Sequence, residues 1–346
     1  MARSLAINRL DRSPVPRPSR HRALTRRRWL LVIAAIGVAA LVFASGVDRT
    51  AARARDGEHC FCDRLVSTEP TRDGFRIATF NIHSCRDLDG RPSLDRITRV
   101  LRDLAPDFVG LQEVRGAFSW SQSQAEKLVG AEGFGWCFAP SERRWWHDHF
   151  GNGALSTLPT GAWRTVSLKN TRGRGYRSYL QCRIDVGKST VCAIVAHLDN
   201  RTDRQVQLRV VLDAFLALPP PAFLAGDLNT TASDPLLAAV LARDDVVDAI
   251  AGVKPAQNAG RIDWILLRGL EPYEGGVLDT SASDHPCVWA GVRIAVTDGA
   301  AAESRGRGRP QRSATLPFAS PCRGRLSVGP IRPAPSFGTS RGSPCA

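Results

Sequence analysis

A carboxylate and an amide stand two residues apart at the end of an apolar segment, "AFLAGDLN" (222–229). Its first four residues are apolar and indicate a buried strand, and Asp227 and Asn229 follow where this strand should end. In an extended chain the side chains at positions i and i+2 point to the same side. The two polar groups are therefore expected to face a common point.

Similar polar residues stand at the ends of other apolar segments: Asn81, Glu113, His197, Asp263, Asp284 and His285. Taken singly, each has an ordinary explanation as a turn residue, a helix cap, half of an ion pair or a core histidine. Asp263 is harder to explain alone, because a buried carboxylate without a partner is costly. The imidazole of His285 would be a suitable partner.

Taken together, these residues indicate one site, since loops and strand ends at one edge of a sheet are where sites are assembled. Several oxygen ligands without a cluster of thiolates suit Mg²⁺, with Mn²⁺ as the alternative, rather than zinc. Two histidines add groups for proton transfer, and one of them has a candidate carboxylate partner. The set predicts metal-assisted hydrolysis of a phosphate ester.

The elements that would position these residues alternate along the chain. Apolar runs predict strands, and spacings of three and four predict helices, the first with Ser93 as cap and Pro106 as stop. Two neighbouring strands, 179–186 and 190–199, should form a hairpin around Gly187. The expected strands are 75–82, 107–114, 153–158, 179–186, 190–199, 222–229, 261–269 and 286–294, and the expected helices are 93–106, 204–218 and 234–243. This order predicts an α/β sandwich of mixed sheets.

The basic charge lies outside this core. The formal net charge is +14, yet residues 1–28 carry nine Arg and one Asp, and residues 297–346 carry eight Arg, one Asp and one Glu. Residues 29–296 hold equal numbers of basic and acidic side chains. The charge therefore gives no evidence that the folded core binds a polyanion. The Arg-, Pro- and Ser-rich stretch 297–346 is expected to be disordered.

The segment 29–47 has no charged residue and is long enough to cross a bilayer as a helix. It follows a basic arm, 1–28, whose last three residues are arginines and should stay in the cytoplasm. "TRRRWLL" also looks like a twin-arginine export signal, and "TAARA" (50–54) offers a cleavage site. We therefore expect a transmembrane anchor or an export signal, then a polar stalk over 48–73. In either case the catalytic domain, 74–296, lies outside the cytoplasm.

Nine cysteines are compatible with that location. Cys182 and Cys192 flank the expected hairpin turn and could face each other. The "CFC" at 60–62 is too tightly spaced for a zinc site. Free buried thiols with one or two disulfides are the expectation.

Seven motifs in order resemble those of the endonuclease/exonuclease/phosphatase superfamily of metal-dependent phosphohydrolases. They are "FRIATFNIH", "PDFVGLQEV", "GNGALST", "VAHLDN" followed by Arg204 and Gln207, "AGDLN", "RIDWILL" and "SDHPCVWAGV". The resemblance covers nearly all of residues 75–294. It implies the four-layered α/β sandwich of that family, with two mixed sheets flanked by helices and preceded here by one hydrophobic helix.

The resemblance also implies roles. Glu113 would be the main Mg²⁺ ligand, with Asn81 and Asp284 near the metal. Asp227 would orient or deprotonate the attacking water, Asn229 would hold water or a phosphate oxygen, and Asp263 would fix the tautomer of His285. His285 would act as a general base or stabilise the phosphorane oxygen. His197 would protonate the leaving group or contact the phosphate. Asn152 and Arg177 are candidate substrate contacts.

The substrate stays open at this stage. A membrane-anchored phosphodiesterase acting on a lipid headgroup is favoured by the hydrophobic segment, and a secreted nuclease acting on DNA or RNA is the alternative. A non-catalytic binding module tethered to the membrane is a third reading, against which the intact residue set argues. The expected partners are the phosphate-ester substrate and the membrane through residues 29–47, and no obligate protein partner is inferred.

Overall fold

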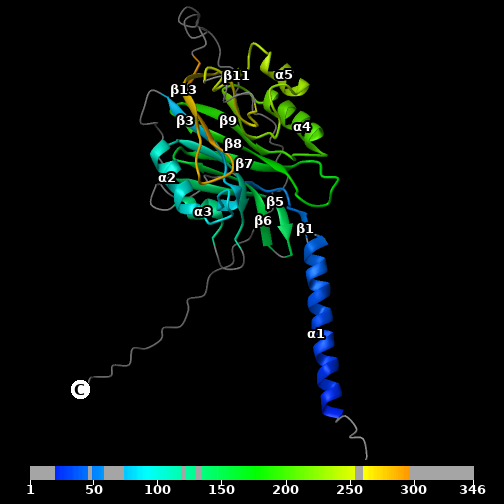
Figure 1. Cartoon of the computed structure of the whole chain (residues 1–346). Coiled ribbons are helices and arrows are strands. Elements are labelled where there is room, and N and C mark those ends of the chain that lie inside the picture. The colour runs from blue at the N-terminus through cyan, green and yellow to red at the C-terminus, as the bar shows by residue number, and fades with distance from the viewer. Residues whose placement is uncertain are drawn as a thin grey trace, which may run out of the picture. The chain divides into compact units, whose positions relative to one another are not determined.

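The computed structural model describes residues 20–45, 49–57, 74–117, 122–129, 134–145, 147–253 and 260–295. Within them, two seven-stranded sheets pack face to face and helices cover their outer faces (Figure 1). The expected disordered tail, 297–346, and residues 1–19 of the expected basic arm lie outside the described residues. The predicted four-layered sandwich of mixed sheets is confirmed.

The first sheet brings the ends of β3 and β4 together. These two strands run parallel, with Asn81 paired to Gln112, and their other neighbours are antiparallel. The strand order is β1 (Arg49–Ala51), β5 (Gly135–Arg144), β6 (His147–Ser156), β4 (Phe108–Arg115), β3 (Phe75–Asn81), β14 (Cys287–Ile294) and β13 (Leu270–Leu278).

The second sheet contains the "AFLAGD" strand at its centre. β9 and β10 run parallel, and β12 lies antiparallel on the other side of β10. The predicted hairpin is confirmed as β8 and β9, joined through Gly187 with a φ of +58°. The strand order is β11 (Val247–Asp248), β12 (Asp263–Arg268), β10 (Ala222–Asp227), β9 (Ser189–His197), β8 (Ser178–Val186), β7 (Thr160–Ser167) and β2 (Asp56–Gly57).

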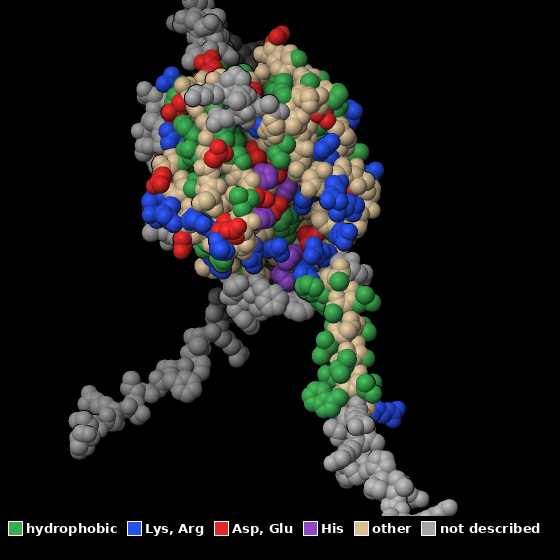
Figure 2. Space-filling model, viewed as in Figure 1, with side chains coloured by type: hydrophobic (Ala, Val, Ile, Leu, Met, Phe, Trp, Pro, Cys, Tyr) green, Lys and Arg blue, Asp and Glu red, His purple; other side chains and the backbone are tan. Residues whose placement is uncertain are grey.

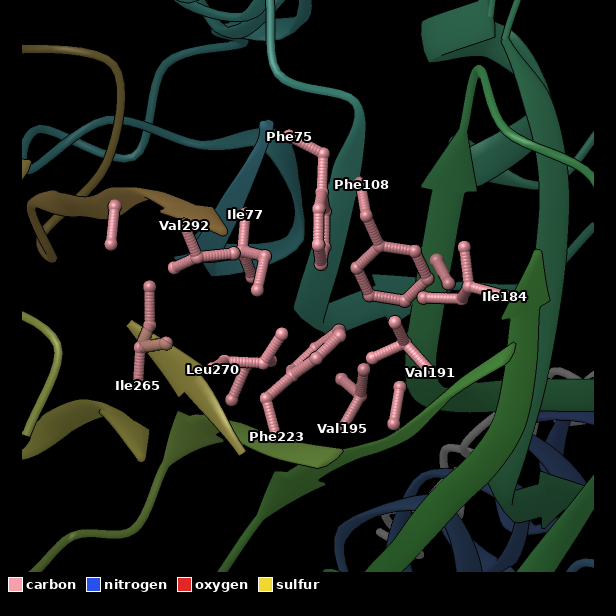
Figure 3. Close-up of a cluster of buried hydrophobic side chains, with 14 of the residues drawn as sticks. Phe75, Ile77, Phe108, Ile184, Val191, Val195, Phe223, Ile265, Leu270 and Val292 are labelled. Atoms are coloured by element: carbon pink, nitrogen blue, oxygen red, sulfur yellow. The ribbon is translucent and has the colours of Figure 1, made fainter. Parts of the chain in front are cut away.

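Three apolar clusters separate the layers. The central cluster fills the space between the sheets, where the rings of Phe108 and Phe223 meet edge to face at 5.4 Å (Figure 3). α2 (Leu94–Leu104) and α3 (Gln124–Val129) cover the first sheet, and α4 (Arg204–Leu216) and α5 (Pro235–Leu241) cover the second. Each helix buries one apolar stripe, as Ile97, Leu101 and Leu104 do on α2.

The start of α2 differs in detail from the expectation, whereas its end agrees with it. Ser93 precedes the helix but its side chain makes no capping hydrogen bond, and the helix ends because Ala105 adopts a left-handed conformation with φ of +46°. Ala105 directly precedes Pro106, which disfavours the α-helical conformation of the residue before it, so the helix ends where the proline predicted. A short 3₁₀ turn, η1 (His83–Cys85), follows β3.

The N-terminal part contains α1 (Arg20–Ser45), whose segment 27–44 is long and apolar enough to cross a membrane. Beyond it, the described part of the expected stalk pairs with both sheets: β1 joins β5, and β2 joins β7. These short strands carry no hydrophobic alternation, which explains why the sequence alone indicated a polar linker.

The cysteine pairing considered for the hairpin is wrong. In the register of β8 and β9, Cys182 pairs with Ala193, and Cys192 pairs with Arg183. A shift of one residue sends the two side chains to opposite faces of the sheet, because side chains alternate along a strand. Cys182 lies in the central cluster and Cys192 under α4. Both are free, as are Cys85, Cys137 and Cys287.

Candidate active site

Three of the predicted residues form a row across neighbouring strands. Asp227 at the end of β10 pairs directly with His197 of β9 and with Asp263 of β12. All three are buried. Residues in one row of a sheet point to the same face, so the register alone gathers an imidazole and two carboxylates.

The motif "GDLN" builds the centre of this row. At Gly226 an added Cβ would lie 2.0 Å from the carbonyl oxygen of Ala196, so only glycine lets the two parallel strands approach at this point. After Asp227 the chain turns through Asn229, with φ of +48°, and the Asn229 N–H donates to Asp227 Oδ1 at 2.9 Å. The motif is thus a tight turn that also fixes one oxygen of the carboxylate.

His285 joins the row from the loop before β14. Its Nδ1 lies 2.9 Å from Asp263 Oδ2, and its Nε2 lies 3.8 Å from Asp227 Oδ2. Burial disfavours the charged ring, but the hydrogen bond and charge of Asp263, with the nearby Asp227 and Asp284, outweigh burial and raise the pKa of His285 to about 9. At neutral pH the ring is therefore a cation that faces Asp227.

The pKa values of Asp227 and His197 are shifted in opposite directions. Burial and then the charge of Asp263 raise the pKa of Asp227 to about 7. Burial, with the charges of Arg177 and His285, lowers the pKa of His197 well below its usual range. The neutral His197 places Nε2 3.4 Å from Asp227 Oδ2. The row therefore holds a carboxylate that can gain or lose a proton near neutral pH.

Asn81 links the first sheet to this row. Its Nδ2 donates to Asp227 Oδ2 at 3.1 Å, and its Oδ1 accepts from the N–H of His83 at 3.1 Å. The Ser283 hydroxyl donates to the backbone carbonyl of Asn81 at 2.6 Å, which connects the loop before β14 to the end of β3. Residues from both sheets thus converge on one carboxylate oxygen.

Glu113 is aimed by a β-bulge. Leu111 pairs with Gly153 and Val114 with Gly151, so two residues of β4 oppose Asn152 alone, and Glu113 has φ of +60°. The bulge lets Leu111 and Val114 both face the helices. The half-buried Glu113 carboxylate makes no hydrogen bond or ion pair with the residues that the structure describes.

Two other predicted residues are less closely joined to the row. Asn152 is buried, and its Nδ2 donates to the Ser178 carbonyl at 2.7 Å, so half of its amide connects the two sheets. Asp284 is 36% exposed and its Oδ1 lies 3.6 Å from Nδ1 of His83. It stands at the rim of the site beside His285.

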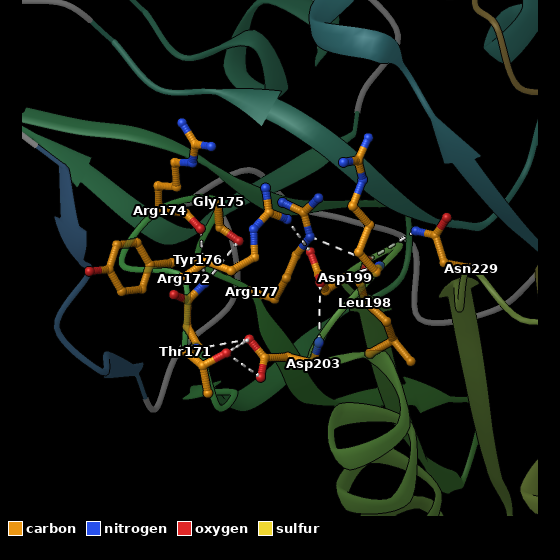
Figure 4. A network of polar contacts seen from close by, with 12 residues as sticks. Thr171, Arg172, Arg174, Gly175, Tyr176, Arg177, Leu198, Asp199, Asp203 and Asn229 are labelled. Carbon is orange, nitrogen blue, oxygen red and sulfur yellow. Dashed lines mark hydrogen bonds and ion pairs between the residues drawn. The ribbon is translucent and has the colours of Figure 1, made fainter. Parts of the chain in front are cut away.

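The arginine-rich loop before β8 separates into different roles (Figure 4). Arg172 is paired with Asp199, with 3.1 Å between Nη1 and Oδ1. Arg177 donates from Nε to the carbonyl of Leu198 at 3.3 Å, and Asn229 donates to the same carbonyl at 3.0 Å. Arg177 is thus held beside the row, whereas Arg172 is already neutralised.

Three further residues support the site: Glu142 and Phe150 were not identified from the sequence, and Gln207 was noted only as following the "VAHLDN" motif. Glu142 is buried and accepts from the N–H of Gly175 at 2.8 Å, and Gln207 accepts from the N–H of Asp199 at 2.7 Å. Phe150 places its ring 6.5 Å from that of His197. Glu142 gave no signal in the sequence, because no strand was expected over the residues of β5.

On the surface, acidic and histidine side chains form a strip in the middle of one face, bordered by Lys and Arg side chains (Figure 2). The donor set suits a hard cation: Glu113 and Asn81 offer oxygens, and Asp263 Oδ1 is buried with no hydrogen-bond partner among the described residues. Asp227, Asp263 and His285 also bring ligand atoms within 4.8 Å of one another. The raised pKa of His285 favours the protonated ring. A protonated imidazole has no free lone pair on nitrogen and cannot coordinate a metal ion.

The sequence matches the model of the endonuclease/exonuclease/phosphatase family over residues 78–285, more than half of the chain. Among solved structures it resembles an endonuclease/exonuclease/phosphatase from Beutenbergia cavernae DSM 12333, at 26% identity and a TM-score of 0.52, over 65% of this chain and 72% of that chain. No curated protein gives a significant match.

Two more distant structures share the fold. One is an endonuclease/exonuclease/phosphatase from Bacteroides vulgatus, at 16% identity and a TM-score of 0.51, over 64% of this chain and 100% of that one. The other is the human Nocturnin catalytic domain with bound sulfate, at 14% identity and a TM-score of 0.50, over 70% and 97%.

Proposed function

Because the chain belongs to the endonuclease/exonuclease/phosphatase family, whose members are generally hydrolytic phosphoesterases, we propose that it is a Mg²⁺-dependent phosphodiesterase. The family is the one that the seven motifs indicated. The observation that carries the proposal is the buried row of His197, Asp227 and Asp263, with His285 hydrogen-bonded to Asp263.

In this proposal Asp227 accepts the proton of the attacking water. A pKa of about 7 keeps a large fraction of the carboxylate ionised at neutral pH while leaving it basic enough to take a proton. The Asn229 N–H and the Asn81 amide fix the orientation of its two oxygens. Water held by these oxygens would be aimed at a phosphorus lying over the row.

The two histidines take different parts because their environments differ. The protonated His285 stabilises negative charge that develops on a phosphate oxygen, and Asp263 holds its ring in place. The neutral His197 acts as a hydrogen-bond donor to the phosphate, since its lowered pKa makes it a poor reservoir of protons. Asn152, Asn229 and Arg177 are proposed as further phosphate contacts.

Glu113, Asn81 and Asp284 would hold the metal ion, Mg²⁺ or alternatively Mn²⁺. When bound, the ion supplies Lewis-acid stabilisation of the phosphate oxygens. The apolar helix α1 would anchor the enzyme in a membrane or direct its export, with the catalytic domain outside the cytoplasm. The substrate and the membrane are the proposed partners.

The test is hydrolysis of bis(p-nitrophenyl) phosphate by the full chain in detergent, with Mg²⁺ and with EDTA. Turnover should require the metal and should fall at least about 1,000-fold in Asp227→Ala, because the base is removed. Asp185→Ala is the matched control, since Asp185 is an exposed residue of the same sheet whose carboxylate accepts from the Thr190 hydroxyl. Metal-independent turnover, or an active Asp227→Ala protein, would refute the proposal.

A further inference from the structure

Two arginines next to the row, the exposed Arg115 and the half-buried Arg177, lack the carboxylate partners that other arginines of the fold have. Arg76 pairs with Glu274 at 2.7 Å, Arg96 with Asp87 at 2.6 Å and Arg172 with Asp199 at 3.1 Å. By contrast, Arg115 and Arg177 form no ion pair with a carboxylate of the described residues. A half-buried cation without a counter-ion is costly, so an anion from outside the chain would stabilise Arg177, while the exposed Arg115 is open to a ligand from solvent.

Phe150 holds these two arginines together. The guanidinium carbon of Arg115 lies 5.8 Å from the centroid of the Phe150 ring, and that of Arg177 lies 5.6 Å from it. The same ring lies 6.5 Å from the ring of His197, so the pair adjoins the row. Stacking on an aromatic ring orients a guanidinium without using its N–H donors.

Neutral acceptors fix the rest of Arg115. Its Nε donates to the Ser84 hydroxyl at 3.1 Å, and its Nη1 lies 2.6 Å from Nε2 of His149. Burial and the charges of surrounding arginines lower the pKa of His149 to about 4, so this ring is neutral and can accept. Nη2 of Arg115 has no partner among the described residues, which leaves two N–H donors for a ligand.

The nearest acidic group is Glu113, two residues before Arg115. Its charge acts on both arginines, but it is also the proposed metal ligand. One phosphodiester carries a single negative charge, which Arg177 and the groups of the row already match. Arg115 therefore remains available for a further anion on the same substrate molecule.

We propose that Arg115, held with Arg177 against Phe150 beside Glu113, binds a second phosphate of the substrate, separate from the phosphate that Arg177 contacts and that is hydrolysed. The inference rests on the proposed phosphodiesterase function and makes it more specific. The preferred substrate is a phosphodiester that carries a further phosphate monoester, either in a soluble molecule or in a lipid headgroup. Arg115 is the residue that selects it.

The test compares thymidine 5′-(p-nitrophenyl phosphate) with the same ester carrying a 3′-phosphate, using the full chain in detergent. Wild type should hydrolyse the doubly phosphorylated ester with kcat/KM about 10- to 100-fold higher, as expected for one or two charge-assisted hydrogen bonds. Arg115→Gln should reduce that ratio to about 1 through KM, and Arg115→Lys should restore part of it. Arg99→Gln, on an exposed arginine bonded to its own helix, should keep the ratio.

A binding measurement separates failure of this inference from failure of the proposed function. In EDTA, pyrophosphate should raise the Tm of wild type more than orthophosphate does, and Arg115→Gln should abolish the difference. Turnover of both esters at equal rates, or an unchanged pyrophosphate shift in Arg115→Gln, overturns the inference alone. Absence of turnover of either ester with Mg²⁺ overturns the proposed function, while the Tm shift still reports on Arg115.

Competition identifies the source of the second phosphate. Hydrolysis of the doubly phosphorylated ester is followed with one competitor at a time. The competitors are pyrophosphate, phosphatidylcholine vesicles, and phosphatidylcholine vesicles that contain phosphatidic acid. Inhibition that needs phosphatidic acid and Arg115 supports a phosphate at a lipid surface, and inhibition by pyrophosphate alone supports a soluble one. If neither competitor depends on Arg115, the inference is wrong.

Discussion

The row on β9, β10 and β12 and the neighbouring ends of β4 and β6 both contribute side chains to the site. The backbone positions these side chains differently in the two regions. In the row, His197, Asp227 and Asp263 follow regular pairing across three strands, and all are buried. At the ends of β4 and β6, a bulge turns Glu113 aside, and Arg115 and Phe150 lie beyond it, partly open to solvent.

In the proposed function, this difference separates the residues of proton transfer from those that bind the metal ion and the substrate. Proton transfer needs fixed distances of about 3 Å, and neighbouring strands in register hold them. Binding a metal and a charged substrate needs side chains that face outward and can be changed without disturbing the sheet. A bulge provides this even between interior strands such as β4 and β6, since it redirects a side chain locally. The regular row should therefore be sensitive to changes in the backbone, and the bulged region of β4 to changes in charge.

Gly226→Ala is expected to break the row and gives the largest effect on stability. The new Cβ would meet the Ala196 carbonyl oxygen at 2.0 Å, so β9 and β10 must move apart beside Asp227. Unfolding by urea should show a loss of about 3 kcal/mol, with activity falling in the protein that stays folded.

The matched control is Gly161→Ala on β7, where the nearest atom to a new Cβ is the Arg183 Cβ at 3.8 Å. Its stability should stay within about 0.5 kcal/mol of wild type. Equal stability of Gly226→Ala and wild type would show that the row tolerates a shift of its backbone.

Glu113→Gln tests the bulged region of β4 through its charge. The carboxylate has no hydrogen bond to the described residues, so the free energy of unfolding in the absence of metal should change little. The Mg²⁺ concentration for half-maximal turnover should rise about 10- to 100-fold, because an amide is a weaker ligand than a carboxylate. Glu271→Gln on exposed β13 is the control. Unchanged metal dependence in Glu113→Gln would remove Glu113 from the metal site.

His285→Asn sharpens the comparison through the pH dependence of stability. The pKa of His285 is about 9 in the folded protein and about 6.5 when unfolded, so the charged ring stabilises the fold. This contribution is fully present below pH 6.5 and is lost as pH rises through 9. The difference in unfolding free energy between wild type and His285→Asn, measured in EDTA, should shrink over that range. A difference independent of pH would contradict the pairing with Asp263.

Much of the fold could be predicted because its strands are buried on both faces and its helices have clear stripes. Expected strands such as 179–186 and 222–229 correspond to β8 and β10, and the helix at 204–218 corresponds to α4. β5, β7 and β13 were missed, since polar residues and glycines interrupt their patterns, although each pairs with the next strand along the chain. Cys182 and Cys192 were mispaired because register cannot be read from a turn.

The sequence by itself indicated the polar groups at the centre of the site, because Asp227, Asn229 and the "SDH" segment interrupt apolar strands where a core would exclude them. Only the tertiary structure decided which groups meet. The pairing of Asp227 with His197 and Asp263, the bulge at Glu113 and the stacking of Arg115 and Arg177 on Phe150 all join residues distant in the chain. Local preferences specify strands and turns, whereas register, burial and unpaired charge arise only when separate strands pack together.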